Sequence, residues 1–201
     1  MTNLEFCKRL NRAGENLDDL EKWDRAVSVV NREFASLPET LLSKLKNSLE
    51  IIKKFKRSVF ALTETINAGQ ICEACQGECC RKGKYHFTVI DLLVYLVEDK
   101  ELFVPCFTNG RCPYSGDAGC LMEVEYRPFN CITFQCEKLE RLLLPVDIDK
   151  FYVLEKELRS EYAVLERTFD KRFAYGLLAN YERDFTEKGT ILLNSFSSGN
   201  S

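Results

Sequence analysis

The sequence predicts a mostly α-helical protein in which a loop-rich cysteine core is braced by an N-terminal helical hairpin and a long C-terminal helix. In both flanks of the 201-residue chain, apolar residues recur every three or four positions, as in helices that bury one face. Between the flanks, nine of the ten cysteines fall between residues 72 and 136, where glycines and other turn residues are frequent. We therefore expect three segments, 1–69, 70–137 and 138–201, packed as one structural domain.

The N-terminal segment is expected to form two helices that fold back on each other. One apolar stripe covers residues 10–37, and Pro38 suits the start of a second helix because its φ angle is already close to the helical value. Ala68-Gly69 is a typical helix stop. A short turn between the helices predicts an antiparallel hairpin. Its 17–66 stripe is regular enough to serve as a seam for a protein partner or a homodimer.

Helical character returns after Pro145, with an apolar stripe over residues 151–181 that predicts the long C-terminal helix. Inside the cysteine region one short helix is expected from residue 89 to about 98. Thr88 is its predicted N-cap, and Asp91 at the third helical position can complete a capping box. The rest of this region is expected to bury little by itself, and small loop-rich units often need a metal to hold them together.

The cysteine chemistry depends on the compartment, and the sequence predicts a cytoplasmic protein. Its first ten residues lack the apolar stretch of a secretory signal, and no run approaches the roughly eighteen apolar residues of a membrane span. Cytosolic thiols are kept reduced, so clustered cysteines there indicate metal binding or catalysis rather than a disulfide framework. The net charge of −3 argues against a nucleic-acid surface, which is usually basic.

The first four clustered cysteines have the spacing Cys72-x2-Cys75-x3-Cys79-Cys80. A CxxC turn directs two sulfur atoms toward one point and is common at zinc and iron–sulfur sites. Cys79 can reach the same point, but the side chains of adjacent residues diverge, so one tetrahedral ion would not easily bind Cys80 as well. We expect either two neighbouring sites or one cluster with a nearby thiol. Four later cysteines also lie beside turn residues: Cys112, Cys120, Cys131 and Cys136.

In these motifs the chain resembles the CxxCxxxCC, or YkgJ-like, family, which is described as zinc- or iron-chelating proteins. The resemblance covers about residues 70–137 and includes the Arg127-Pro128 pair. It implies that Arg127 lies near the cofactor, where it would donate hydrogen bonds to sulfur or balance thiolate charge. Cys7 and Cys106 are not placed in the family pattern, and we expect neither to bind metal. The implied metal ligands are Cys72, Cys75, Cys79, Cys80, Cys112, Cys120, Cys131 and Cys136.

The favoured function is that of a metal-binding protein with an iron–sulfur cluster of the 4Fe–4S type, in a redox or modifying-enzyme accessory role. All the implied ligands are cysteines, and a cluster offers several iron corners to the diverging sulfurs of the Cys79-Cys80 pair. Family members related to flagellin lysine N-methylases also carry an iron–sulfur cluster. Zn²⁺ accepts four thiolates too, so a structural zinc-binding interaction module is an alternative, as is metal storage or delivery. The single histidine, His86, is expected not to be a ligand.

Overall fold

The computed structural model describes residues 17–75, 78–107, 112–116, 119–173, 175–185 and 190–192, and it confirms the mostly helical class. The longer helices are α2 (Leu17–Ala35), α3 (Glu39–Glu64), α5 (Val89–Val97) and α8 (Pro145–Phe169). The short helical elements are α4 (Ala68–Ala74), η1 (Glu78–Tyr85), η2 (Val124–Tyr126), α6 (Phe129–Thr133), α7 (Glu137–Glu140), α9 (Leu177–Asn180) and η3 (Tyr181–Phe185). Two short antiparallel strands, β1 (Ser115–Gly116) and β2 (Gly119–Cys120), pair with Ser115 opposite Cys120.

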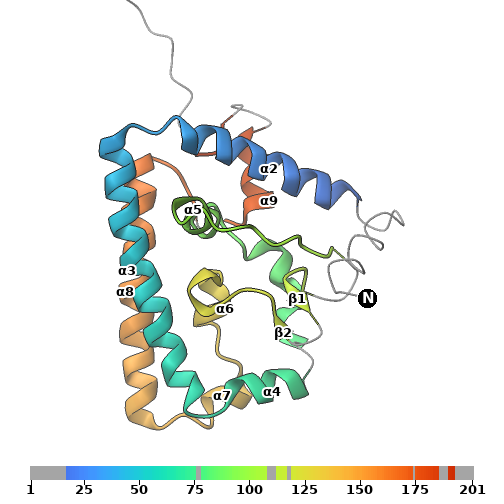
Figure 1. Ribbon diagram of the computed structural model, residues 1–201. Helices are drawn as coiled ribbons and strands as arrows, with labels where there is room; N and C mark the ends of the chain where they lie inside the picture. Colours follow the sequence, from blue (N-terminus) through green and yellow to red (C-terminus); the bar gives the residue numbers. More distant parts are fainter. Residues whose placement is uncertain are drawn as a thin grey trace, which may run out of the picture.

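The two longest helices, α3 and α8, lie side by side and form one wall of the molecule (Figure 1). Each buries apolar residues of the stripe predicted from its sequence: Leu45, Leu49, Ile52 and Val59 on α3, and Phe151, Leu158 and Leu165 on α8. Burial of each such side chain contributes about 1.5–3 kcal/mol. This part of the 17–66 stripe, predicted as a seam for a partner, is therefore covered within the chain. The stripe predicted over residues 151–181 is not one helix, because α8 ends at Phe169, before Asp170 with a left-handed backbone, and α9 is separate.

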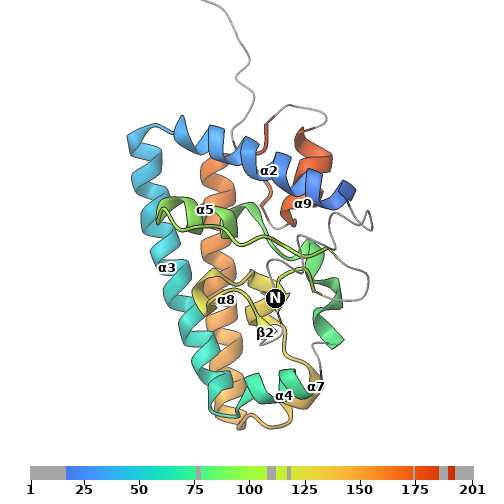
Figure 2. The ribbon, with the colours of Figure 1, turned by 45° about the vertical axis from the view of Figure 1, so that its right-hand side comes forward.

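Helix α2 crosses the end of the α3–α8 pair instead of running back along α3, as Figures 1 and 2 show. Both N-terminal helices are confirmed, but their arrangement differs from the expected antiparallel hairpin. The cause lies in the apolar face of α2, which packs against α5 and α9. On that face the ring of Trp23 lies 4.9 Å from the ring of Phe87 and 5.9 Å from that of Tyr114, measured between centroids. An aromatic cluster of the cysteine region thus takes the place expected for α3.

Helix α3 ends at Glu64, before the stop expected at Ala68-Gly69. The break is made by Asn67, which has a left-handed backbone with φ of 54°. Asparagine adopts this conformation more readily than most residues with a side chain. Ala68 and Gly69 then begin α4, the short helix that carries Cys72. The correction places the first cysteines on a helix rather than in a loop.

Helix α5 confirms the capping box predicted at its start. The Thr88 hydroxyl accepts a hydrogen bond from the Asp91 amide (3.3 Å), and the Asp91 carboxylate accepts one from the Thr88 amide (2.9 Å). Every residue from 89 to 95 is buried. The rest of the cysteine region does not form a core of its own; several of its apolar side chains join the core shared with the flanking helices: Phe87, Phe107, Tyr114, Met122, Tyr126 and Ile132.

The last described residues are fastened to α2 by a buried carboxylate. Glu33, 6% exposed, accepts hydrogen bonds from the amides of Ile191 (3.1 Å) and Leu192 (2.5 Å). Both of these apolar side chains are buried, although the helical pattern of the sequence stops before them. Within the described residues, no helix combines the length and apolar character needed to cross a membrane.

Candidate metal centre

Segments that are distant in the sequence meet around Cys131 in α6. The Sγ atom of Cys131 lies 3.5 Å from Nδ1 of His86, which directly follows η1. Element η1 also contacts the turn that contains Cys112. A Cβ atom at Gly83 of η1 would lie 2.5 Å from Sγ of Cys112. The absence of a side chain at Gly83 therefore lets the Cys112 sulfur lie against the backbone of η1.

The β1–β2 hairpin brings Cys120 close to the Cys112 turn. Ser115, in β1, pairs with Cys120, and its amide donates a hydrogen bond to the carbonyl of Cys112 (3.1 Å). The Leu121 amide donates to the Tyr114 carbonyl (2.8 Å), which continues the pairing beyond the strand. Cys112 is half-buried and Cys120 is exposed, so this part of the centre lies between the core and the surface.

The thiols of this group influence one another electrostatically. Burial raises the pKa of Cys112 to about 11, and the negative charge that Cys120 would carry adds to the rise. A backbone hydrogen bond from Tyr114 opposes it. Burial raises the pKa of Cys131 well above its ordinary value, and Cys112, Cys120, Asp91 and Cys80 add to the rise. Neighbouring thiolates repel each other, whereas a bound cation stabilises the deprotonated form of its ligands.

His86 is closer to the thiols than the sequence predicted. Burial lowers its pKa, which favours the neutral imidazole. The neutral ring is also the form that binds metal ions. In the sequence, only the position of His86 six residues after Cys80 indicated a possible metal ligand. The many nearby cysteines made a histidine ligand unnecessary.

The CxxC cysteines lie on a different element from this group. Cys72 is in α4 and Cys75 is its C-cap, with the Cys75 thiol donating to the Cys72 carbonyl (3.2 Å). Cys136 is the N-cap of α7, and α4 and α7 lie next to each other at one end of the molecule (Figures 1 and 2). Cys79 is in η1, but its side chain lies outside the described part of the chain, as does all of Cys7.

The donor chemistry of these residues suits zinc and iron–sulfur centres, which prefer soft thiolate ligands. Cys75, Cys106, Cys112, Cys120, Cys131 and Cys136 are free thiols. Four thiolates around one zinc ion would place their sulfur atoms about 3.8 Å apart, given a zinc–sulfur bond of about 2.3 Å. Among the described residues, no three His, Cys, Asp or Glu side chains are grouped closely enough to hold a single ion. The described thiols thus gather in one region without forming a complete single-ion site.

Arg127, which was expected to lie beside the cofactor, has other partners, and so does Lys84 of η1. The Arg127 Nε atom donates to the Met122 carbonyl (3.1 Å), and its guanidinium lies 5.1 Å from the centroid of the Phe60 ring. The Lys84 ammonium pairs with Asp19 of α2 (2.5 Å). The first residue thus contacts α3, and the second joins η1 to α2. The role of Arg127 beside the cofactor stays a prediction.

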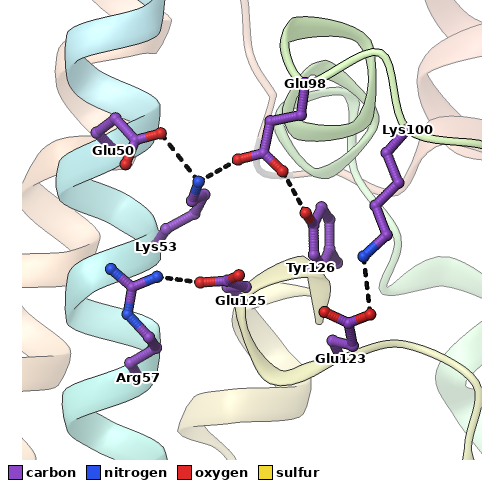
Figure 3. A network of polar contacts seen from close by, with 8 residues as sticks. All are labelled: Glu50, Lys53, Arg57, Glu98, Lys100, Glu123, Glu125 and Tyr126. Carbon is purple, nitrogen blue, oxygen red and sulfur yellow. Dashed lines mark hydrogen bonds and ion pairs between the residues drawn. The ribbon is translucent and has the colours of Figure 1, made fainter.

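A polar network joins α3, the residues just after α5 and the residues around η2 (Figure 3). Lys53 of α3 pairs with Glu50 (2.9 Å) and with Glu98, just after α5, and Glu98 also accepts a hydrogen bond from the Tyr126 hydroxyl. Burial alone would raise the pKa of Glu98, but the bonds from Lys53 and Tyr126 outweigh it and hold the pKa below its ordinary value. Two further ion pairs complete the network: Arg57–Glu125 and Lys100–Glu123.

A fully buried ion pair, which the sequence did not predict, joins α3 to α5. Lys56 of α3 and Asp91 of α5 are both fully buried and form an ion pair of 2.9 Å. The Tyr162 hydroxyl, from α8, donates to the same carboxylate (3.0 Å). Lysine is almost never fully buried unless it is paired. The only signal was a lysine placed next to the apolar stripe of α3, where charged residues usually point into solvent.

Comparisons with family models, curated proteins and solved structures give no match to this chain.

Proposed function

We propose that this chain is a metal-binding cysteine-cluster protein whose centre is built around Cys131. The observation that supports it is a chain of contacts between separate segments. Cys131 of α6 meets His86, just after η1, Gly83 of η1 meets Cys112, and the β1–β2 hairpin follows the Cys112 turn. Thiols become strong metal ligands once they are deprotonated, and metal binding itself drives that deprotonation. Reduced thiols gathered from separate segments are therefore well placed to bind a soft metal together.

We further propose that the predicted ligands form two neighbouring sets. Cys80, Cys112, Cys120 and Cys131 would form one set, because their charges act on one another. The adjacency of α4 and α7 supports a second set. That set would consist of Cys72, Cys75, Cys79 and Cys136. This division follows the divergence expected for the side chains of the Cys79-Cys80 pair.

The favoured cofactor is an iron–sulfur cluster of the 4Fe–4S type, in line with the CxxCxxxCC resemblance and the all-cysteine ligand set. Such a cluster would supply one-electron transfer, in a redox role or as an accessory to a modifying enzyme. The chain's own residues would hold the cluster through thiolates and shield its inner side with the aromatic core. Zinc binding by the same thiols, as a structural interaction module, is the second candidate, because Zn²⁺ accepts the same donors. Metal storage or delivery is a further alternative, and a cytoplasmic location is proposed for all three.

Anaerobic purification followed by metal and acid-labile sulfide analysis tests the proposal. An iron–sulfur protein should be brown and contain iron and sulfide in comparable amounts. A structural zinc protein should be colourless, because Zn²⁺ has a filled d shell, and should contain zinc without sulfide. Anaerobic protein that is folded and contains neither iron nor zinc would overturn the proposed function.

A further inference from the structure

Asp91 holds the chain on the His86 side of the Cys131–His86 contact. One of its carboxylate oxygens accepts hydrogen bonds from the Thr88 amide (2.9 Å) and the Thr88 hydroxyl (2.7 Å). Thr88 follows His86 by two residues, and the intervening Phe87 is fully buried. The carboxylate therefore fixes the backbone from which His86 projects.

The same carboxylate also holds the Cys131 side of the contact. Its other oxygen accepts a hydrogen bond from the Tyr162 hydroxyl (3.0 Å). The Tyr162 ring packs edge-on against Phe129, with 5.3 Å between the ring centroids. Phe129 is the first residue of α6 and precedes Cys131 by two residues. Asp91 is thus the shared anchor of the two elements that meet at Cys131.

Lys56 completes this buried group from α3. Its ammonium lies 2.9 Å from the Asp91 carboxylate, neither side chain has any exposed surface, and the Tyr162 ring centroid is 5.8 Å from the ammonium. Burying an ion pair carries a desolvation cost, and apolar replacements of such pairs are often equally stable or more stable. Stability alone is therefore a weak reason for these charges. Their directional hydrogen bonds instead fix α3, α5 and α8 relative to the segments that carry the thiols.

We propose that Asp91, together with Lys56 and Tyr162, positions Cys131 for metal binding. The three side chains are positioning residues, since they act through Thr88 and Phe129 rather than by touching the metal. The inference rests on the proposed function, because it concerns the geometry of the same centre. Groups that orient metal ligands in this way usually affect metal affinity ten- to a hundred-fold when they are removed.

The test uses the full chain, purified without oxygen and carrying whatever metal it binds. Three variants are compared: Asp91→Asn, Tyr162→Phe and, as a matched control, Glu98→Gln. Glu98 also pairs with a lysine of α3, Lys53, in the separate network of Figure 3. Two quantities are measured: the rate of metal loss to excess EDTA and, where the bound centre contains iron, its absorption spectrum. Thermal unfolding of each variant is recorded in parallel.

We expect Asp91→Asn to lose metal about ten- to a hundred-fold faster than the unmodified chain, with an altered absorption spectrum. Tyr162→Phe removes only a hydroxyl and should change the rate of metal loss and the spectrum in the same direction. The rate of metal loss should rise roughly three- to ten-fold. Glu98→Gln should leave the spectrum unchanged and the rate within about two-fold, even where it lowers the unfolding temperature. If Asp91→Asn does not fold, Tyr162→Phe decides the question, because it keeps the ring that packs on Phe129.

Unchanged rates and spectra in Asp91→Asn and Tyr162→Phe would overturn the inference. Equal acceleration in all three variants would overturn it as well, because the effect would then follow general stability. Neither result would touch the proposed function, which fails only if the unmodified chain carries no metal. The two failures are therefore distinguishable in one set of measurements.

Discussion

Gly83 lies directly against the sulfur atom of Cys112. A Cβ atom at position 83 would be 2.5 Å from that Sγ atom, closer than real side chains approach one another. Gly69, in α4, is the opposite case, because a Cβ atom there would meet nothing within 4 Å. The two glycines therefore separate the effect of crowding the thiol from the effect of adding a methyl group.

Gly83→Ala should displace the Cys112 sulfur and weaken metal binding. Overpacking at such a contact costs about 1–3 kcal/mol, which corresponds to roughly a five-fold to a hundred-fold change in an equilibrium. Metal content after dialysis against EDTA, measured on anaerobic protein, is the readout. Gly69→Ala is the control, and it should keep its metal and gain up to about 1 kcal/mol of stability from the better helix former. Equal metal retention in both variants would show that the Gly83–Cys112 contact is not part of the centre.

Gly176→Ala should destabilise the whole fold. Gly176 forms a bridge with Thr88, and the Leu177 amide donates to the Phe87 carbonyl (2.6 Å). A Cβ atom at 176 would overlap the Tyr85 carbonyl, and a backbone group cannot move aside as a flexible side chain can. We expect a loss of at least about 1–3 kcal/mol in urea unfolding. An unchanged unfolding midpoint would mean that α9 docks on this segment less closely than the structure shows.

The Glu98 carboxylate should make stability depend on pH in the acid range. Its pKa in the folded protein is below the ordinary value of 4.5, so the group stabilises the fold fully above about pH 4.5. This contribution is lost as the pH falls through the lower, folded-state pKa. Glu98→Gln should cost about 1.5–3 kcal/mol at pH 7, the range for hydrogen bonds to a charged group, and progressively less below pH 4.5. Urea unfolding at a series of pH values measures the difference.

Glu123→Gln is the matched control for this pH effect. Glu123 also pairs with a lysine, Lys100, in the network of Figure 3, but its side chain is 68% exposed, against 25% for Glu98. Exposed ion pairs are screened by water and salt and contribute little. The control should therefore unfold like the unmodified chain across the pH range. The interpretation of Glu98 fails if both variants show the same pH profile.

The long helices and the α5 capping box could be predicted because their signals are local. Apolar spacing gives the buried face of α3 and α8, and Thr88 with Asp91 gives the start of α5. The direction of α2 depends on Trp23 meeting Phe87, residues far apart in the sequence, so periodicity could not reveal it. The early end of α3 depends on one left-handed residue, Asn67, next to a more obvious glycine.

The candidate site was predictable by residue type but not by arrangement. Cysteine spacing identifies the thiols, whereas the contact of His86 with Cys131 arises only when η1 and α6 pack together. The burial of Lys56 likewise depends on a carboxylate from another helix, Asp91, which the sequence indicated only as a helix cap. Long-range pairing of polar groups leaves no periodic trace in a single sequence.

Substitutions by serine should sort the cysteines into ligands and bystanders. Cys131→Ser and Cys75→Ser should lower the metal content of anaerobic protein, because a neutral hydroxyl replaces a thiolate. Cys106→Ser should keep its metal but lose some stability, because the Cys106 side chain is buried and a hydroxyl is costlier to bury than a thiol. Cys7→Ser should change neither quantity. Similar metal loss at all four positions would refute the sorting.

Removal of the metal should loosen the thiol-bearing elements while the helical core stays folded. The α3–α8 pair and α5 are held by buried apolar side chains and by the Lys56–Asp91 pair, none of which requires a metal. Elements α4, η1 and β1–β2 contribute little to that core, so metal binding should supply much of their order. Hydrogen exchange with and without EDTA, followed by mass spectrometry, measures this difference. Amide protection should fall in residues 68–75, 78–85, 115–116 and 119–120 and persist in residues 89–97. Loss of protection in α5 to the same degree would show that the metal holds the entire core, and unchanged protection throughout would show that these elements fold without it.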